Sequence, residues 1–470
     1  MNASANHDET LTSSHVSRPG EGLRPSVVRV NRDLRRDLYA ALCAALLVLT
    51  AVLVGTAIQH RNGSLRVGWP PLLASWDPHV GPGTPAAVVV AAAVVAYGPS
   101  LAARLPWRSL LLAVWGASMA WTWSLALVDG WHRGVAEQLT TRNEYLPAVG
   151  RFHDIPAALR DFTRHILIDS PDNWGAHVAG HPPGATLTFV LLDRIGLGGG
   201  GWAGTWCITV GTTAAVAVLV AVRTLAAESL ARRAAPFLVL APAAVWVGTS
   251  ADGYFAAVAA WAVALLALAV RGVRSALNGF CSGLLFGLTV YLSYGLTLMA
   301  VVAGAVVWMG SSRRRPLLFA LAGFVVVPAV FTALGFEWWE GYRILVTRYY
   351  QGAGGVRPYG YWVWANLACT VLIVGPATVA GVRRAVVGLR PHGGWSRSSP
   401  RPLAVLVLAA VLALLIADLS GMSKAETERI WLPFAVWLLP ACAFLTGARG
   451  WLVGQAVLAL LLNHLLLTGW

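Results

Sequence analysis

Long apolar runs separated by short polar connections make up most of the chain after residue 37. Many runs contain about seventeen or more apolar residues, the length that a helix needs to cross roughly 30 Å of hydrocarbon. The charge-free runs lie at 38–58, 86–103, 109–128, 202–222, 235–249, 253–270, 276–294, 295–310, 317–335, 361–381, 402–418, 430–447 and 450–468. The sequence therefore predicts an all-α, polytopic transmembrane helix bundle of about thirteen spans.

Arginines alternate with the apolar runs so that their dense clusters fall on one side of the predicted bundle. This side carries Arg24 to Arg36, Arg104 and Arg108, Arg223 to Arg233, Arg271 and Arg274, Arg313 to Arg315, Arg383 to Arg401, and Arg449. Because Lys and Arg concentrate in cytoplasmic loops, we expect the N-terminus inside and the C-terminus outside. The outer side then receives loops 129–201, 336–360 and 419–430, with residues 182–198 as a juxtamembrane helix along the membrane surface.

The composition is typical of a membrane protein and argues against a nucleic-acid partner. The chain is 57% hydrophobic and 12% charged, and the charge fraction is about half that of a soluble domain. The net charge of +14 comes mostly from arginines between apolar runs, so we predict no nucleic-acid partner. The five cysteines lie inside apolar runs and form no metal-binding pattern. Residues 1–37 lack an apolar signal-peptide core and are predicted to be a disordered cytosolic tail before the membrane domain 38–470.

The first large outer loop contains two candidate general bases, Glu144 and Asp154. A carboxylate that is partly desolvated at a membrane surface can remove a proton from a reacting hydroxyl. The alternative is that both are ordinary solvated loop residues. Glu144 directly precedes Tyr145, and the same loop continues to His177 and the segment GHPPG around His181.

The acidic residue beside Tyr145, followed by His181-Pro182-Pro183 opening a juxtamembrane helix, resembles the GT-C class of integral membrane glycosyltransferases. Protein O-mannosyltransferases and lipid A aminoarabinose transferases belong to this class. The resemblance implies a polyprenyl-phosphate sugar donor and a loop carboxylate as base. His177 and His181 are four residues apart, but the prolines and glycines around them argue against a zinc pair on one helix. No cofactor is assigned, and a divalent metal is left open.

A second match to the same class is SKAETERIWLPF, residues 423–434. The resemblance lies in Glu428, Arg429, Leu432 and Pro433 at the start of a late transmembrane helix. Lys424 and Arg429 are predicted to neutralise the donor phosphate, with Glu426 or Glu428 orienting the guanidinium. The alternative is an ordinary helix start with Thr427 as its cap.

Two further segments supply candidates on the outer side. Arg343 and Arg348 lie in the aromatic loop 336–360 and are additional phosphate candidates. The Trp and Tyr residues of this loop fit a glycan site and a plain interfacial belt equally well. Asp252, at the outer start of a predicted span, either lines the site or caps the helix.

Together these features predict a plasma-membrane glycosyltransferase with its site on the extracytoplasmic face. The overall pattern is most similar to the actinobacterial branch that contains the methylthioxylose transferases of lipoarabinomannan. That resemblance implies transfer of a pentose-like or mannose-like sugar to a cell-envelope glycan or glycolipid, with inversion. Many class members carry an Asp-Glu pair before the Tyr where this chain has Thr141 and Arg142, so the base stays open between the two candidates. The rival function is a multi-pass transporter or a flippase for lipid-linked sugars.

Overall fold

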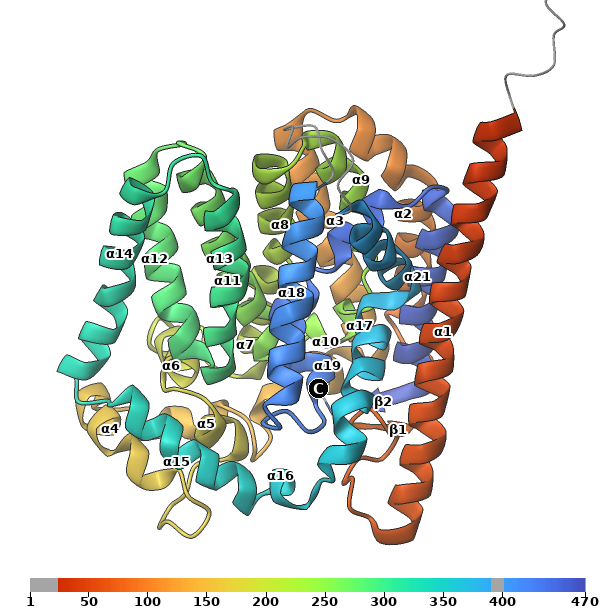
Figure 1. Ribbon diagram of the computed structural model, residues 1–470. Helices are drawn as coiled ribbons and strands as arrows, with labels where there is room; N and C mark the ends of the chain where they lie inside the picture. Colours follow the sequence, from red (N-terminus) through yellow and green to blue (C-terminus); the bar gives the residue numbers. More distant parts are fainter. Residues whose placement is uncertain (1–23, 390–400, 470) are drawn as a thin grey trace, which may run out of the picture.

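The computed structural model describes residues 24–389 and 401–469, and α-helices dominate this part of the chain (Figure 1). Within these ranges the strands are β1 (Ala74–Trp76) and β2 (Leu466–Thr468). They pair antiparallel, with Ser75 opposite Leu467, and so bring the C-terminal end of the described chain beside the segment after the first helix. The predicted all-α helix bundle is confirmed.

Within the described ranges, nine helices are long and apolar enough to cross a membrane. They are α1 (Arg24–Asn62), α2 (Thr84–Arg104), α3 (Trp107–Ala126), the continuous pair α7 (Gly200–Gly211) and α8 (Thr213–Leu225), α11 (Ala251–Val270), α12 (Ser275–Leu292), α14 (Arg314–Ala333), α17 (Tyr359–Gly388) and α18 (Arg401–Leu419). Each corresponds to an apolar run of the sequence. The chain is therefore a polytopic membrane protein.

Three of the other four predicted spans are broken into short pieces. They are α9 (Glu228–Val239) with α10 (Ala244–Val247), η6 (Tyr294–Leu298) with α13 (Met299–Met309), and α20 (Leu432–Ala435) with η7 (Leu439–Phe444). The fourth is α21 (Ala448–Leu465), which is continuous but less apolar than the nine long helices. Pro242 lies between α9 and α10, where proline cannot supply the N–H that continues a helix, and Pro440 lies in the first turn of η7, where its missing N–H is tolerated. Irregular backbone is tolerated at membrane depth when protein buries it, and the residues around both prolines are buried.

The predicted tail 1–37 lies only partly within the described residues. Residues 1–23 are outside the described part, and helix α1 begins at Arg24, so residues 24–37 are helical. Asp37, at the end of the predicted tail, is fully buried and accepts hydrogen bonds from Arg383 and Arg384 of α17. This pairing holds the start of the first span against α17, so residues just before the apolar run also belong to the bundle.

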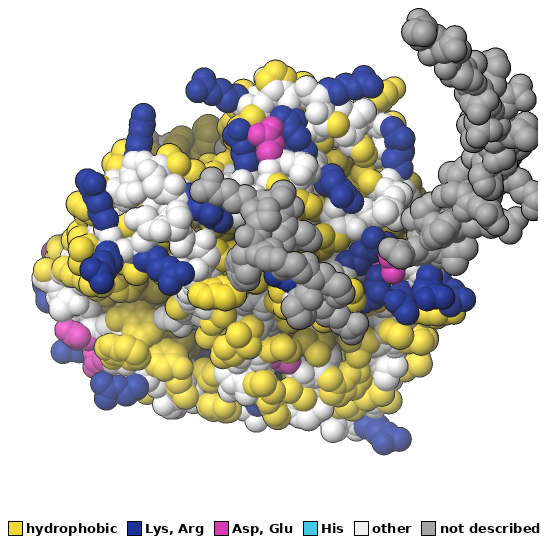
Figure 2. Space-filling view, turned by 45° about the horizontal axis from the view of Figure 1, so that its top comes forward, with side chains coloured by type: hydrophobic (Ala, Val, Ile, Leu, Met, Phe, Trp, Pro, Cys, Tyr) yellow, Lys and Arg dark blue, Asp and Glu magenta, His cyan; other side chains and the backbone are white. Residues whose placement is uncertain are grey.

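The arginine-rich connections gather at one end of the bundle, which we call the arginine end. Arg232 donates to the carbonyl of Leu105, Arg271 to Leu225, and Arg384 to Phe444, so these hydrogen bonds join residues of five connections at this end. Figure 2 shows Lys and Arg side chains spread over this end. The sequence-predicted grouping of the arginines on one side is thus present in the structure.

Short helices and loops fill the opposite end, which we call the loop end (Figure 1). Its elements are η1 (Leu127–Asp129), η2 (His132–Ala136), η3 (Gln138–Thr140), η4 (Leu146–Arg151), α4 (Ile155–Asp161), η5 (Phe162–His165), α5 (Ala176–Gly180), α6 (Gly184–Arg194), α15 (Trp338–Gln351), α16 (Ala353–Val356) and α19 (Thr427–Ile430). Helix α6 matches the predicted juxtamembrane helix within 182–198. These elements carry the predicted site residues.

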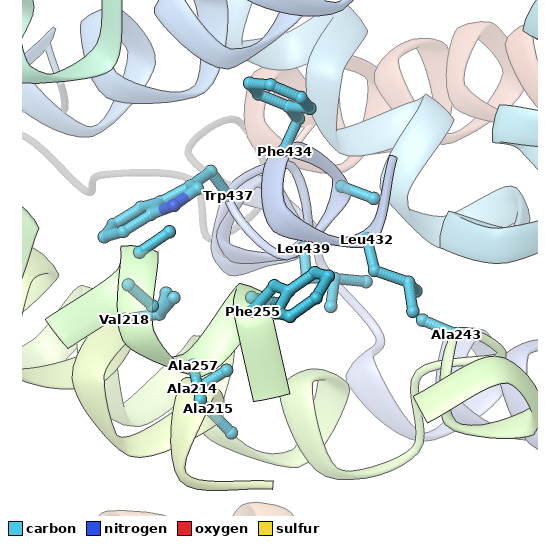
Figure 3. Packing of buried hydrophobic residues seen from close by; sticks show 14 of the residues in the cluster. Ala214, Ala215, Val218, Ala243, Phe255, Ala257, Leu432, Phe434, Trp437 and Leu439 are labelled. Atoms are coloured by element: carbon cyan, nitrogen blue, oxygen red, sulfur yellow. The ribbon is translucent and has the colours of Figure 1, made fainter. Parts of the chain in front are cut away.

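A buried apolar cluster fixes the late segment against the centre of the bundle. Figure 3 shows Phe255 of α11 beside Leu432 and Leu439 of the segment that follows α19. All three side chains are at most 2% exposed. Because α19 directly precedes Leu432, this packing holds Arg429 next to the start of α11.

Candidate functional site

Arg429 lies at the centre of a buried polar network at the loop end. Its Nη1 donates to Asp252 Oδ2 at 2.5 Å, and its Nη2 contacts His177 Nε2 at 2.8 Å and Glu426 Oε2 at 3.1 Å. Only 4% of Arg429 is exposed. Burial alone would lower the pKa of Arg429, but Asp252 and Glu426 together raise it above its ordinary value. The guanidinium is therefore charged and largely neutralised by its neighbours.

Asp252 reaches this network from the first turn of α11. The cap of that helix is Ser250, whose Oγ accepts a hydrogen bond from the backbone N–H of Asp252 at 3.1 Å. The Asp252 carboxylate therefore does not cap α11 and contacts Arg429 instead. Of the two roles predicted for Asp252, the structure supports the one that lines the site.

Glu144 and His177 form the third side of the network. Glu144 Oε1 lies 2.7 Å from His177 Nδ1, and both residues are buried. The backbone N–H of His177 donates to Asn143 O at 2.9 Å, so the start of α5 rests on the turn that carries Glu144. A Cβ at Gly175 would lie 2.6 Å from Arg142 O, so glycine permits this close approach.

The GHPPG segment ends α5 and begins α6, as its prolines predict. His181 lies between the two helices and donates from Nδ1 to His177 O at 2.7 Å. Burial lowers the pKa of His181 to about 4, so this imidazole is neutral at physiological pH. Within the described ranges no three His, Cys, Asp or Glu side chains group as a metal site requires.

The turn before α19 adds Lys424 and Glu426. Ala425 and Glu426 adopt left-handed backbone angles, with φ of 73° and 61°, which are uncommon for residues other than glycine. Arg357 holds this turn by donating to Lys424 O at 2.8 Å and to Glu426 Oε1 at 3.2 Å. Burial raises the pKa of Glu426, but Arg429 and Arg357 outweigh it and lower the pKa below its ordinary value.

The ammonium group of Lys424 is held more loosely than the guanidinium of Arg429. Lys424 Nζ donates to Gly354 O at 2.9 Å and lies 5.5 Å from the centre of the Tyr350 ring. In the described part of the chain, no carboxylate lies within ion-pair distance of Lys424. Its positive charge is therefore available to an anion.

Glu428 points away from Arg429. Its Oε1 accepts a hydrogen bond from the backbone N–H of Leu73 at 2.9 Å, and its Oε2 has no partner among the described residues. Burial raises the pKa of Glu428 to about 7. Glu428 therefore joins α19 to the segment before β1, and the predicted role of orienting the guanidinium belongs to Glu426 alone.

A small cavity adjoins the network and has a volume of about 10 Å³, enough for roughly one water molecule. It is lined by Gln138, Glu144, Tyr145, His177, Thr249, Ser250, Ala251, Asp252 and Arg429. The Tyr145 hydroxyl is buried there without a hydrogen-bond partner among the described residues. Burial raises the pKa of Tyr145 well above its ordinary value, so this hydroxyl is a neutral donor.

Three predicted residues lie outside the contacts of this network. Asp154 is exposed and caps α4 by accepting from the N–H of Ala157 at 2.9 Å. Arg343 is exposed on α15 and donates to Trp339 O within its own helix. Arg348 is half-buried on the same helix, and its Nη1 has no partner in the described ranges.

Sequence reasoning missed Gln138, Thr249, Ser250 and Arg357. The first three are small polar residues beside predicted elements, and nothing in their spacing distinguishes them from ordinary caps. Arg357 is one arginine among three in an aromatic loop, although it is only 7% exposed. Lys424, which the sequence analysis did single out, is distinctive because it is the only lysine among the 35 Lys and Arg residues of the chain.

Comparisons with known proteins place the chain only coarsely. No protein-family model matches it, and no curated protein is similar to it. Among solved structures, it is similar to the crystal structure of the Archaeoglobus fulgidus oligosaccharyltransferase in complex with zinc and sulfate. The TM-score is 0.44 at 14% identity, covering 74% of this chain and 51% of that chain. The chain thus spans about half the length of that structure.

Proposed function

We propose that the chain is an integral membrane glycosyltransferase of the GT-C type, which moves a sugar from a polyprenyl-phosphate donor to a cell-envelope glycan or glycolipid. The observation that carries the proposal is the position of Glu144, a buried carboxylate at a cavity. Within the described ranges, Glu144 contacts His177 and no guanidinium. A carboxylate that is buried but not ion-paired is suited to accept a proton.

Glu144 is a better base than the other acids of the network. Asp252 and Glu426 both contact Arg429, and Glu426 also contacts Arg357. A direct guanidinium partner stabilises the ionised carboxylate and weakens it as a base. Asp154 is occupied as a helix cap. Of the two candidates that the sequence left open, we therefore choose Glu144.

Lys424 is the better phosphate ligand. The charge of Arg429 is already offset by Asp252 and Glu426, so we assign this arginine to hold the acidic side chains in place. Lys424 lies on the same turn and carries a charge without a carboxylate partner in the described part. A cation where negative charge accumulates stabilises the departing phosphate in the transition state. Arg348 on the neighbouring α15 is a second candidate for this role.

In the proposed reaction, Glu144 removes the proton of an acceptor hydroxyl as its oxygen attacks the anomeric carbon. The bond from that carbon to the phosphate oxygen breaks, and the electron pair leaves with the polyprenyl phosphate. One direct displacement inverts the anomeric centre. The cavity has room for a single hydroxyl group of the substrate, to which the Tyr145 hydroxyl can donate. The carboxylates around it would repel an acidic sugar.

The distribution of arginines supports an extracytoplasmic site. The arginine end lies opposite the loop end, and Lys and Arg favour the cytoplasmic side. A polyprenyl donor embedded in the outer leaflet would reach the loop end laterally. The finer assignment to a methylthioxylose transferase of lipoarabinomannan follows from the sequence resemblance and stays part of the proposal.

A transporter or flippase is the second candidate, and the break in α17 favours it. Gly375 has φ of 77° inside that helix, and broken helices are common at transporter binding sites. However, Gln455 fills the break by donating to Val374 O at 2.8 Å. The charged network also lies at one end of the bundle, whereas transporter sites lie near the membrane midplane.

The test is sugar transfer by protein reconstituted in nanodiscs with a panel of labelled polyprenyl-phosphate sugars and envelope glycans. The wild type is expected to transfer one of these sugars, Asp154→Asn to retain that activity, and Glu144→Gln and Arg429→Ala to lose it. Equal transfer by Glu144→Gln and the wild type would refute the site. Movement of intact lipid-linked sugar between leaflets of vesicles, without transfer, would favour the flippase.

A further inference from the structure

His177 bridges the two functional halves of the network. Its Nε2 lies 2.8 Å from Arg429 Nη2, and its Nδ1 lies 2.7 Å from Glu144 Oε1. The imidazole is buried, and its backbone is fixed by Asn143 O on one side and by the His181 ring on the other. These contacts leave the ring a single orientation between a cation and the proposed base.

Hydrogen-bond chemistry determines which nitrogen carries the proton. A guanidinium can only donate, so His177 Nε2 must accept from Arg429. The remaining nitrogen, Nδ1, then carries the proton and lies 2.7 Å from Glu144 Oε1, although the N–H is not aligned on that oxygen as in a regular hydrogen bond. Arg429 thereby sets the tautomer of His177, and His177 presents a donor to Glu144.

We infer that His177 is a positioning residue that orients the Glu144 carboxylate for proton abstraction. This inference rests on the proposed function and adds a role to it. With Oε1 of Glu144 occupied by His177, Oε2 is the oxygen that receives the proton of the acceptor hydroxyl. His177 itself does not act as the base, because Arg429 occupies its unprotonated nitrogen.

Charged and titratable groups from several elements face this pair. They are Asp252 of α11, Arg429 of α19, Glu426 of the turn before α19, Cys207 of α7, and Tyr145 and His181 of the first outer loop. Asp252 and Glu426 contact Arg429 directly, whereas His177 contacts Glu144. Variants of His177 therefore change the contact to Glu144 and leave the ion pairs of Asp252 and Glu426 in place.

Two substitutions separate positioning from simple packing. Gln at position 177 retains one donor and one acceptor, whereas Leu retains neither. We expect His177→Leu to lower kcat roughly tenfold or more, the effect of losing a hydrogen bond to a charged group, with little change in KM for the lipid donor. His177→Gln should restore kcat in large part, which a loss of packing alone would not explain. His153→Gln, at an exposed histidine of the same loop, should match the wild type.

The protonation state can also be measured without activity. In nanodiscs, the spectrum of the wild-type protein with ¹⁵N-labelled histidine should contain a signal for a protonated Nδ1 with an unprotonated Nε2 that disappears in His177→Gln, whereas the corresponding signal of His181 remains. A protonated Nε2 in the signal assigned to His177, or an unchanged kcat in His177→Leu, would overturn the inference. If the wild type transfers no sugar from any donor, the proposed function fails, and the NMR tautomer alone then decides whether Arg429 and His177 are coupled to Glu144.

Discussion

Both ends of the bundle bury an ion-paired network, but the balance of charge in the two networks is opposite. At the arginine end, one carboxylate, Asp37, accepts from two guanidiniums, Arg383 at 2.6 Å and Arg384 at 2.5 Å. At the loop end, three carboxylates meet two guanidiniums: Arg429 contacts Asp252 and Glu426 and reaches Glu144 through His177, and Arg357 also contacts Glu426.

In our proposal, this difference separates a structural ion pair from a reactive site. An excess of arginine satisfies Asp37 completely and joins α1 to α17, so no acid or base is left for chemistry. An excess of carboxylate leaves Glu144 without a direct cation, and the cavity adjoins that carboxylate. The same side-chain types therefore stabilise the bundle at one end and leave a proton acceptor at the other.

The largest expected effect is the loss of transfer in Glu144→Gln. Removing a general base lowers the rate by about 10²- to 10⁴-fold, and the amide keeps the shape of the side chain. The measurement is kcat for labelled sugar transfer in nanodiscs. Glu137→Gln, an exposed glutamate of the same loop, serves as the matched control and should retain full activity.

Asp37→Asn should reduce stability without altering the chemistry. Breaking a buried ion pair costs about 3 kcal/mol or more, so the variant should melt at a clearly lower temperature in a thermal-unfolding experiment. Asp33→Asn, one turn earlier in α1 and only partly buried, should melt close to the wild type. A normal melting temperature for Asp37→Asn would remove the distinction between the two ends.

Glu428 should make the stability of the folded protein depend on pH. Its pKa in the folded protein is raised to about 7, so its protonated form favours the folded state at low pH. This contribution, about 3 kcal/mol for a shift of this size, is fully present below the ordinary pKa and is lost as pH rises through 7. Glu428→Gln should therefore gain thermal stability relative to the wild type between pH 5 and 8. Glu340→Gln, an exposed substitution, should follow the wild type across this range.

The smallest expected effect concerns the donor. Lys424→Gln should raise KM for the polyprenyl-phosphate sugar about tenfold, the effect of losing one charge-assisted hydrogen bond. High salt should weaken donor binding by the wild type more than by this variant. Arg343→Gln on the exposed face of α15 should leave KM unchanged. A KM for Lys424→Gln equal to that of the wild type would show that Lys424 does not bind the donor phosphate.

Much of the fold follows from the sequence because length, hydropathy and arginine position are local properties. The apolar runs predict the nine long helices, and the arginine clusters predict which connections share an end. The breaks around Pro242 and Pro440 were not predicted, because a buried irregular segment has the same hydropathy as a span. The role of Asp37 was missed because its partners, Arg383 and Arg384, are more than 340 residues away.

The site was predictable in its members but not in their roles. Glu144, His177, Asp252 and Arg429 stand in segments that the sequence singles out, and the structure brings them into contact. Their roles depend on which oxygen faces which cation. That pairing reassigns Arg429 from phosphate binding to positioning in our proposal and separates Asp154 from Glu144.

The central claim is that the acid-rich network is catalytic and the arginine-rich network is structural. The most direct test measures sugar transfer and melting temperature side by side for Glu144→Gln and Asp37→Asn in nanodiscs. The account predicts that Glu144→Gln is folded and inactive, whereas Asp37→Asn is less stable and active below its melting temperature. An active Glu144→Gln protein would contradict it.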